Sequence, residues 1–321
     1  MIKAFYLLCL SAVFFFCASA QEEKTQETGA GWIKYSDNPV LGGDLGTIFD
    51  LSVIKDHEGK FLMYCSWRPQ KSIALSESTD GLNWSTPVIC LKYDESSNWE
   101  KDLNRPVVTM KDGIYHMWYT GQTDDQSWIG YATSNDGRIW ERKSKKPVLS
   151  PDLPWEKVAV MCPHVIWDKE EQIFKMWYSG GEQYEPDAIG YATSKDGLHW
   201  KKYPKNPIFV YSPSNLWEQR KVTACQVMKR DHDYLMFYIG FQSLECARIG
   251  MARSKDGISN WERYNGNPII SPGKGWDVTA VYKPYVVPDE KNNRWLLYYN
   301  GRNEKLEQIG VAIHEGMDLE F

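Results

Sequence analysis

The chain has 321 residues, of which 42% are hydrophobic and 14% aromatic, and its formal net charge at pH 7 is -5. A chain of this length can bury a large core, and all-β architectures of similar size often form one domain. The acidic balance, without a basic stripe, argues against nucleic acid or an anionic membrane as a partner, so the expected ligand is neutral or small.

The N-terminal segment has the pattern of an export signal. Residues 1–20 carry one lysine, an apolar run and a small-residue ending, Ala18-Ser19-Ala20, which is typical of a signal peptide and its cleavage site. No later apolar run is long enough to cross a bilayer, so we expect no membrane span and a periplasmic or secreted protein. Residues 21–30 are rich in Glu, Gln, Thr and Gly and indicate a disordered leader. One domain over 31–321 remains.

An internal repeat dominates the rest of the sequence. Ile-Gly pairs recur every 60 residues, at Ile129, Ile189, Ile249 and Ile309. An aromatic strand ending in glycine precedes each pair, and a Ser-x-Asp-Gly turn with a later tryptophan follows the first three. A fixed period of this kind is the signature of repeat architectures. Apolar runs separated by Asp-Gly turns predict antiparallel β-strands joined by hairpins.

The first and last copies of the repeat are incomplete in complementary ways. The first unit starts its aromatic strand at Met63-Tyr64, and the last unit ends after Ile309-Gly310 without its own proline-marked strand. Asn38-Pro39-Val40-Leu41, a strand of that kind, precedes the first unit. An edge strand tolerates proline, so the N-terminal strand is expected to complete the last blade and hide its edge. The pattern predicts an all-β fold, a five-bladed β-propeller of four-stranded antiparallel blades closed by the N-terminal strand.

Residues that recur in every unit are expected to be structural, because chemistry needs a residue only once. The Asp-Gly turns supply the conformation of a tight hairpin. Each Trp-acid pair is more often a feature that joins blades than a catalytic group; these pairs are Trp99-Glu100, Trp155-Glu156, Trp217-Glu218 and Trp276-Asp277. The cysteines that follow the signal segment are scattered and form no CxxC pair, which predicts apolar fillers and no metal site.

Function is expected where the repeat is broken. In a propeller the innermost strands begin around a central funnel, so side chains at their entrances converge. Alignment of these strands by their apolar runs places five residues at one level: Asp50, Arg105, Cys162, Ala224 and Lys283. Three of them are charged. Placing charges in a narrow, partly dry funnel costs free energy, so a functional role for them is expected. The alternative is an ion-pair network that plugs the channel.

Two inner strands carry recognisable motifs, Phe49-Asp50-Leu51-Ser52-Val53 and Met161-Cys162-Pro163-His164-Val165. The first is similar to the Asp-Pro-Ser-Val start of glycoside hydrolase family 43. The second is similar to Glu-Gly-Pro-His-Ile of that family and to Glu-Cys-Pro of family 32. The chain thus resembles the five-bladed glycosidases of families 43, 32, 68, 117 and 130, closest in style to 43 and 32. The resemblance implies a glycosidase in which Asp50 is the base that activates water or the nucleophile.

The chain departs from these families at the other two catalytic carboxylates. Met161 stands where the general-acid glutamate is expected, and Arg105 or Val107 stands where a second aspartate is expected. Some relatives carry calcium in the channel, but Arg105 and Lys283 at this level argue against a cation. Apart from that calcium, no cofactor is expected.

Glycoside cleavage needs one protonated carboxyl group and one ionised carboxylate. For the acid we expect Glu156 or Glu218, each a few residues before an inner strand, with Asp102 and His164 as weaker candidates; family 117, which the chain also resembles, uses a histidine. Cations after Glu218 could hold a carboxylate or sulfate of a substrate. The expected site comprises catalytic Asp50, Glu156 and Glu218 with substrate-binding Asp102, Arg105, His164, Arg220 and Lys283.

These observations favour an exported, exo-acting glycosidase that acts on oligosaccharide or polysaccharide fragments from plants or algae. The alternative is a carbohydrate-binding propeller that has lost catalytic activity, which Met161 favours. A purely interacting scaffold is a third interpretation. None of the residues Asp50, Arg105 and Lys283 is repeated at the matching position of another unit. This favours the enzyme, because a lectin-like propeller is expected to repeat its site in each blade.

Overall fold

The computed structural model describes residues 28–319 and 321. The expected signal peptide over 1–20 and the leader over 21–27 lie outside the described residues. At the end of the expected leader, the N–H of Gly29 donates to the carbonyl oxygen of Ile269 at 2.9 Å. The regular elements of the described part are twenty β-strands and five short 3-10 helices, which confirms an all-β fold. Within this part, no helix has the length and apolar character needed to cross a membrane.

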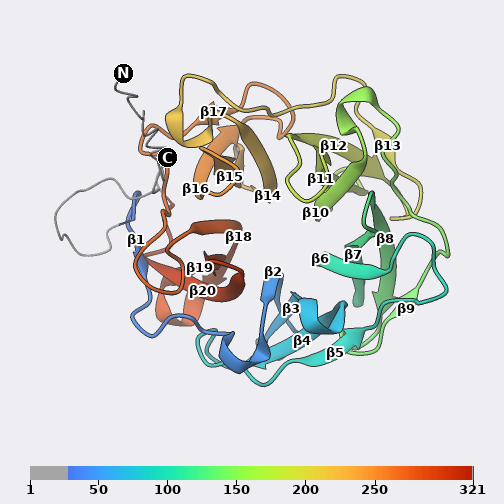
Figure 1. The fold of residues 1–321 in the computed structure, drawn as a ribbon, viewed down its shortest axis with the longest axis horizontal. Coiled ribbons are helices and arrows are strands. Elements are labelled where there is room, and N and C mark those ends of the chain that lie inside the picture. Colours follow the sequence, from blue (N-terminus) through green and yellow to red (C-terminus); the bar gives the residue numbers. More distant parts are fainter. Residues whose placement is uncertain (1–27, 320) are drawn as a thin grey trace, which may run out of the picture.

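The strands follow one another in antiparallel sets of four, and β2, β6, β10, β14 and β18 lie nearest the common centre (Figure 1). The first set is β2 (Ile48–Lys55), β3 (Phe61–Trp67), β4 (Ser72–Ser78) and β5 (Val88–Leu91). The second is β6 (Asp102–Lys111), β7 (Ile114–Gln122), β8 (Ser127–Ser134) and β9 (Glu141–Arg142). The third is β10 (Ala159–Asp168), β11 (Ile173–Gly181), β12 (Ala188–Ser194) and β13 (Lys201–Lys202).

The fourth set is β14 (Lys221–Lys229), β15 (Tyr234–Phe241), β16 (Ala247–Ser254) and β17 (Glu262–Arg263). The last set is β18 (Ala280–Asp289), β19 (Arg294–Asn303), β20 (Leu306–Glu315) and β1 (Trp32–Lys34), in which β1 pairs antiparallel with β20. One parallel pairing, Ala159 with Ser127, joins the second and third sets into a single sheet. The 3-10 helices are η1 (Gly43–Leu45), η2 (Arg68–Gln70), η3 (Pro154–Glu156), η4 (Leu216–Glu218) and η5 (Glu290–Asn292).

The outer strands differ from the sequence expectation. Only β5 follows its proline as a strand; β9, β13 and β17 are two residues long and precede theirs. Beyond those prolines the chain makes single bridges to the Ile-Gly strand, for example Leu149 with Ile129. Proline has no N–H to donate, so it interrupts the ladder between the two outer segments.

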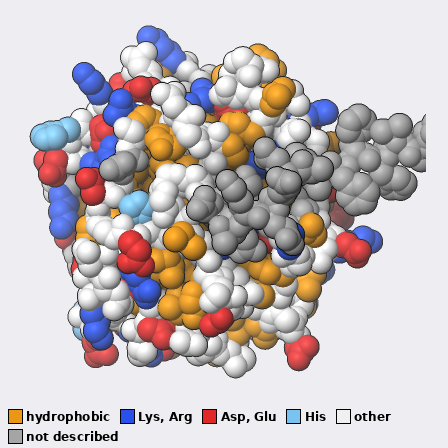
Figure 2. Space-filling model, turned by 90° about the vertical axis from the view of Figure 1, so that its left-hand side faces the viewer, with side chains coloured by type: hydrophobic (Ala, Val, Ile, Leu, Met, Phe, Trp, Pro, Cys, Tyr) orange, Lys and Arg blue, Asp and Glu red, His pale blue; other side chains and the backbone are white. Residues whose placement is uncertain are grey.

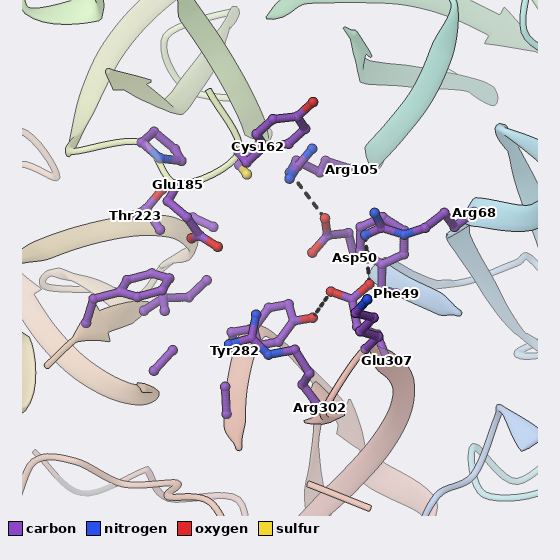
Figure 3. A pocket seen from close by; sticks show the side chains of 18 of the residues that line it. Phe49, Asp50, Arg68, Arg105, Cys162, Glu185, Thr223, Tyr282, Arg302 and Glu307 are labelled. Carbon is purple, nitrogen blue, oxygen red and sulfur yellow. Dashed lines mark hydrogen bonds and ion pairs between the residues drawn. The ribbon is translucent and has the colours of Figure 1, made fainter. Parts of the chain in front are cut away.

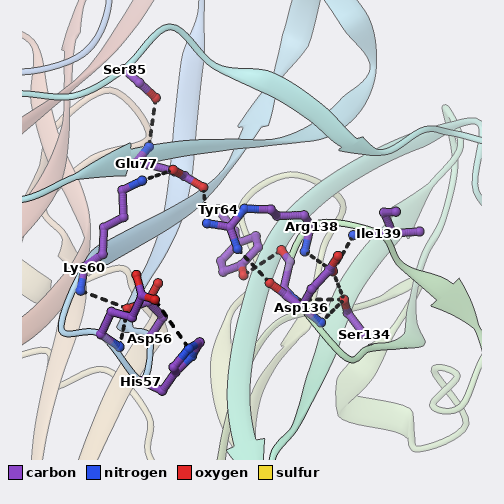
Figure 4. Close-up of polar contacts among 12 residues, drawn as sticks. Asp56, His57, Lys60, Tyr64, Glu77, Ser85, Ser134, Asp136, Arg138 and Ile139 are labelled. Atoms are coloured by element: carbon purple, nitrogen blue, oxygen red, sulfur yellow. Dashed lines mark hydrogen bonds and ion pairs between the residues drawn. The ribbon is translucent and has the colours of Figure 1, made fainter.

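The Ser-x-Asp-Gly turns are structural, as expected, and they connect neighbouring sets of strands (Figure 4). In the second set the hydroxyl oxygen of Ser134 accepts the N–H of Gly137 at 2.9 Å, and the Asp136 carboxylate accepts two further N–H groups of the turn. The Tyr64 hydroxyl of the first set donates to the Gly137 carbonyl at 2.9 Å. Arg138, from the same turn, pairs with Glu77 of the first set at 2.6 Å.

The same aromatic-to-turn bond links other sets. Trp118 of the second set donates to the Gly197 carbonyl of the third at 3.0 Å, and Trp177 of the third donates to Gly257 of the fourth at 2.8 Å. Tyr298 of the last set donates to the Gly81 carbonyl of the first at 2.6 Å, across 217 residues of sequence. The sequence repeat therefore corresponds to one type of hydrogen bond that recurs between neighbouring sets of strands.

The Trp-acid pairs form a second recurring structure, inside four of the five sets. Each buried carboxylate accepts the hydroxyl of a tyrosine on the second strand and pairs with a cation on the outer strand. The four groups are Glu100 with Tyr119 and Arg142, Glu156 with Tyr178 and Lys202, Glu218 with Tyr238 and Arg263, and Asp277 with Tyr299 and Lys34. A Cβ on the second-strand glycine would overlap the pair's tryptophan, as at Gly180 against Trp155. The last group takes its cation from β1.

Free cysteines lie mostly in the core of the described part, and charged side chains of both signs lie on its visible surface. Cys65, Cys162 and Cys225 are buried and free, in keeping with apolar fillers, and Cys90 is free and half-buried. Figure 2, which shows the side of the molecule that carries β1, displays positive and negative side chains interspersed among apolar patches. The visible face thus carries no field of a single sign.

Candidate active site

The five inner strands share a bulge at the positions that the sequence alignment placed at one level. Strand pairing shifts register around each of them, and all five have a positive φ. The residues are Asp50 (φ 49°), Arg105 (56°), Cys162 (51°), Ala224 (37°) and Lys283 (53°). A positive φ is uncommon for non-glycine residues and persists only where the surroundings enforce it. The predicted equivalence of these residues is therefore confirmed.

Side chains of the neighbouring set hold four of these bulges in place. The hydroxyl of Ser66 accepts the N–H of Arg105 at 2.8 Å, and Thr120 and Ser179 do the same for Cys162 (3.2 Å) and Ala224 (2.8 Å). For Asp50 the acceptor is the amide oxygen of Asn300, in the last set, at 3.0 Å. These contacts fix where the side chains of the inner strands point.

A cavity of about 510 Å³ opens above two of the predicted site residues, Asp50 and Arg105 (Figure 3). Its volume lies in the range of small-molecule sites. Charged side chains make up a large part of its wall: Asp50, Glu185, Glu304, Glu307, Arg68, Arg105, Arg302 and Lys305.

Asp50 is a buried carboxylate held from two sides. Its Oδ2 lies 3.2 Å from the Nε of Arg105, and its Oδ1 accepts the amide N–H of Asn300 at 2.9 Å. Only 4% of the residue is exposed. Arg105 also donates to Gln122 at 3.1 Å. Burial opposes the charge of the Arg105 guanidinium, but Asp50 and other acidic groups raise the pKa of Arg105 above its ordinary value. The two charges stabilise each other.

Glu185 faces Asp50 across the cavity (Figure 3). It lies in the loop between β11 and β12, next to Tyr184, whose φ is +68°. Burial raises the pKa of Glu185 from 4.5 to about 7; Arg105 and Arg302 oppose this rise, and the charge of Asp50 adds to it. A carboxyl group with a raised pKa thus faces a carboxylate that is paired with Arg105, the arrangement that an acid and a base require.

The sequence analysis missed Glu185. The available signal was the loop Gln183-Tyr184-Glu185-Pro186-Asp187, which no other unit repeats. Rules based on the inner strands could not identify it, because this loop joins the second and third strands of its set.

The raised pKa of Glu185 predicts a pH-dependent stability. Between pH 4.5 and about 7 the unfolded chain releases this proton while the folded chain retains it, so stability falls as pH rises through that window. Glu185→Gln cannot ionise, and we expect it to unfold with a free energy about 1–3 kcal/mol above that of the wild type at pH 8. At pH 4 the two proteins should be equally stable. Urea titrations at both pH values measure this, and equal stability at pH 8 would contradict it.

Glu307 is a third carboxylate of the cavity, on β20. It accepts the hydroxyl of Tyr282 and pairs with Arg68 at 2.7 Å. Burial and the Glu307 charge raise the pKa of Tyr282 well above its ordinary value, so this phenol keeps its proton. The Arg68 guanidinium also lies over the Phe49 ring, 4.6 Å from its centre. The Glu307 carboxylate is therefore held by two donors, the Tyr282 hydroxyl and the Arg68 guanidinium.

Two other predicted site residues, Lys283 and Asp102, lie near the centre but do not line this cavity. Lys283 is 2% exposed at the level of the ring but is not part of the cavity wall. Asp102 lines an adjoining cavity of about 340 Å³ that shares Arg68, Arg105 and Tyr184 with the first. Burial raises the pKa of Asp102, with Arg68 and Arg105 opposing, and its Oδ1 is buried without a partner among the described residues.

Glu156 and Glu218 are not at the cavity, which corrects the expectation that one of them is the acid. Glu156 is 0% exposed and accepts the N–H groups of Asp152 and Leu153, the Tyr178 hydroxyl and the Lys202 ammonium at 2.7–2.9 Å. Proximity in sequence to an inner strand misled the prediction, because the 3-10 turn directs each glutamate into its own set of strands.

A substitution separates this structural role from a chemical one. Because Glu156→Gln removes a buried charge and leaves Lys202 with only the exposed Asp152 carboxylate as an ion-pair partner, we expect a loss of about 2–4 kcal/mol in the free energy of unfolding. The rate constant of the folded enzyme should not change. Urea unfolding and kcat measured well below the transition temperature check both. A loss of kcat in fully folded protein would return Glu156 to the active site.

His164 and Arg220 also lie apart from the cavity wall. The Nε2 of His164 is 2.9 Å from the carbonyl oxygen of Val227, and burial lowers the pKa of His164 to about 3, so the ring stays neutral. Its place on β10 beside the bulge turns it away from the cavity. Arg220 is exposed just before β14. Neither meets the predicted role of binding substrate in this cavity.

The channel does not fit the calcium ion that the resemblance implies. Calcium prefers several oxygen ligands, mainly carboxylates and carbonyls. At the ring level stand Arg105 and Lys283, and the single carboxylate, Asp50, is bound to Arg105. In the described part of the chain no three His, Cys, Asp or Glu side chains are grouped to hold a metal.

Several curated proteins are similar in sequence to part of this chain. A 1,2-beta-oligomannan phosphorylase of Thermoanaerobacter is 29% identical over 253 residues, which cover 76% of this chain and 78% of the relative. An uncharacterized protein of Mycobacterium tuberculosis is 28% identical over 208 residues, 59% of this chain, and the match spans 65% of the relative's length. An acid beta-fructofuranosidase of Solanum lycopersicum is 25% identical over 201 residues, 58% of this chain and 29% of the relative.

Solved structures share the fold. A thermostable family-43 glycoside hydrolase has a TM-score of 0.69 at 19% identity, over 85% of this chain and 91% of its own. A structure from work on family 130 mannoside phosphorylases and hydrolases has a TM-score of 0.73 at 15% identity, over 94% and 98%. The family model of Glycosyl hydrolases family 43 matches residues 36–314. The resemblance seen at the inner strands is thus confirmed, and the chain belongs to glycosyl hydrolases family 43.

Proposed function

We propose that the chain hydrolyses glycosidic bonds, with Glu185 protonating the leaving oxygen and Asp50 acting as the base that activates water or as the nucleophile. The observation that carries the proposal is the pair of carboxyl groups on opposite walls of one cavity, one with a pKa of about 7 and one in an ion pair. Glu185 keeps a substantial protonated fraction at neutral pH, while Arg105 and Asn300 orient the Asp50 oxygens.

The remaining polar groups of the cavity are suited to binding the sugar. Glu307 and Arg68 hold each other in place and present oxygen and nitrogen atoms to the cavity. Phe49 and Tyr184 add aromatic surface to the cavity wall. Apolar sugar faces pack on aromatic rings, while sugar hydroxyls exchange hydrogen bonds with charged groups, whose bonds are stronger than neutral ones.

The site depends on the closure of the fold, which we propose is a five-bladed β-propeller closed by the N-terminal strand. Two contacts between the first and last sets support this, Asp50 with Asn300 and Gly81 with Tyr298. A third contact lies inside the last set, where Lys34 of the N-terminal strand β1 pairs with Asp277. Closure places Asp50 from the first blade beside Asn300 of the last. A broken ring would leave this carboxylate without one of its two anchors.

We further propose that the enzyme is exported and acts on the ends of oligosaccharides from plant or algal polysaccharides. The export signal pattern of residues 1–20 supports export. A cavity with a loop carrying Glu304 and Lys305 at its wall supports cleavage at chain ends. Curated relatives named as oligomannan phosphorylase and fructofuranosidase support an oligosaccharide substrate.

A panel of aryl glycosides and oligosaccharides, assayed with and without inorganic phosphate, tests the proposal. We expect turnover of at least one member without phosphate, at a rate that Asp50→Asn strongly lowers. Cleavage that requires phosphate would replace hydrolysis by phosphorolysis. Binding of sugars without turnover of any panel member would support the alternative, a carbohydrate-binding protein without catalytic activity.

A further inference from the structure

The inner wall of the cavity carries three arginines beside three carboxyl groups, Asp50, Glu185 and Glu307. Arg68 on η2, Arg105 on β6 and Arg302 on β19 line it (Figure 3). Lys283 adds a buried ammonium at the level of the ring, and no other described residue forms an ion pair with it. Its charge also acts on Cys162, a residue of the cavity wall. Four positive charges therefore converge on this region.

The carboxylates of the same region balance only part of that charge. Asp50 and Glu307 are each bound to an arginine, at 3.2 and 2.7 Å. Glu185 contributes no charge in the protonated state that its role as an acid requires. Glu304 and Lys305 are exposed and of opposite sign, so their charges cancel at the rim of the cavity. The inner region is thus left with two more positive than negative charges.

Arg302 is the cation with binding capacity to spare. Arg68 and Arg105 already hold a carboxylate of the cavity. Arg302 donates to the carbonyl oxygen of Glu245 at 2.9 Å and lies 3.2 Å from the Glu245 carboxylate, which is 82% exposed and so a weak partner. The Nε of Arg302 is buried and has no acceptor among the described residues.

A second polar atom of the cavity lacks a partner. Thr223 is 3% exposed, lines the cavity on the side of Glu185, and its Oγ1 makes no hydrogen bond to a described residue (Figure 3). Buried polar groups are as a rule hydrogen-bonded, so such atoms call for an explanation. A bound ligand with oxygen atoms explains both Thr223 and Arg302. An anionic ligand also explains the excess of positive charge.

We propose that the sugar bound in this cavity carries a carboxylate, as in a hexuronic acid residue, and that the Arg302 guanidinium binds that group. This inference rests on the proposed function, because it names the substrate class of the same site. Arginine presents a planar fork of donors that matches a carboxylate, and charge-assisted bonds of this kind are short and strong. Lys283 contributes a positive potential that favours an anion without contacting it.

Matched pairs of sugars test the proposal by calorimetry at constant ionic strength. The probes are glucuronate, galacturonate and mannuronate, each against its parent hexose, and inorganic phosphate. We expect at least one uronate to bind the wild type at least tenfold more tightly than its hexose. Arg302→Gln should remove at least tenfold of that affinity and Arg302→Lys a smaller part, whereas Arg138→Gln, on a surface turn outside the cavity, should remove none.

The comparison of acid and hexose on the wild type decides the proposal even if an Arg302 variant fails to fold. Equal or tighter binding of the hexose in every pair overturns it, and so does binding of phosphate but of no uronate. Uronate affinity that survives in folded Arg302→Gln overturns the role of this arginine. Hydrolysis of neutral glycosides without preference for acids would support the proposed function alone. Uronate binding without turnover would support only the present inference.

Discussion

Replacement of Glu185 by glutamine is expected to lower kcat on oligosaccharides by about 10²–10⁴-fold, the range that a positioned general acid contributes. The amide keeps the size of the side chain but has no acidic proton for the leaving oxygen. Strongly acidic phenols leave as phenolates without that proton, so the variant should cleave their aryl glycosides at close to the wild-type rate. Measuring kcat on both substrate classes therefore separates loss of the acid from loss of the site.

The pH dependence gives Glu185 a second, independent signature. The protonated form is the active one, so kcat/KM should fall as pH rises above about 7, the pKa of this group in the folded protein. Glu185→Gln should lose that alkaline limb. Glu182→Gln is the matched control, because Glu182 lies in the same loop but is not part of the cavity wall. Its partner Lys221 keeps its ion pair with Asp187 and its bond to the Glu185 carbonyl oxygen in this variant. Equal losses on activated and natural substrates would assign the acid to another group.

Replacement of Asp50 by asparagine is expected to lower kcat by a similar factor, about 10²–10⁴, but on both substrate classes. Activation of water, or attack on the sugar, is needed whichever group leaves. Asparagine retains an oxygen that can accept from Arg105, and Arg105 keeps its bond to Gln122, so the geometry should largely survive. Rates on activated and natural glycosides provide the measurement.

Two comparisons guard the interpretation of the Asp50 variant. Asp168→Asn changes another buried aspartate, which pairs with Lys175 and Lys229 outside the cavity. That control should lose stability and keep kcat. Glu307→Gln tests the third carboxylate of the cavity. Full activity in Asp50→Asn together with a large loss in Glu307→Gln would transfer the anionic role to Glu307 and contradict the assignment of Asp50.

The repeat made the scaffold predictable in detail. Sixty-residue periodicity located the strands, and alignment of the inner ones found the five bulge residues, because equivalent positions in a repeat share one backbone conformation. The same alignment predicted Asp50 and Arg105 as site residues, because they are charged at a position where two other units carry cysteine and alanine. The turns and Trp-acid pairs were correctly interpreted as structural, since they recur.

The proposed acid could not be found in this way. Glu185, Glu307 and Arg302 lie on or beside the loops that join the second and third strands, where the units differ in sequence and no period guides an alignment. Glu156 and Glu218 were misassigned because short distance in sequence to an inner strand was taken for closeness to the cavity. Their side chains instead complete hydrogen-bonded networks within their own sets of strands.

By itself, the sequence determined the strand order, the repeating contacts and the position of one carboxylate, since these follow from local patterning and periodicity. Only the tertiary structure decided which groups face Asp50. Convergence of loops from separate sets buries Glu185, and that burial, not the residue type, raises its pKa to about 7. The same convergence gathers arginines from three sets around the cavity. Burial and the proximity of charges are properties of the folded arrangement, and for that reason the amino-acid sequence alone does not reveal them.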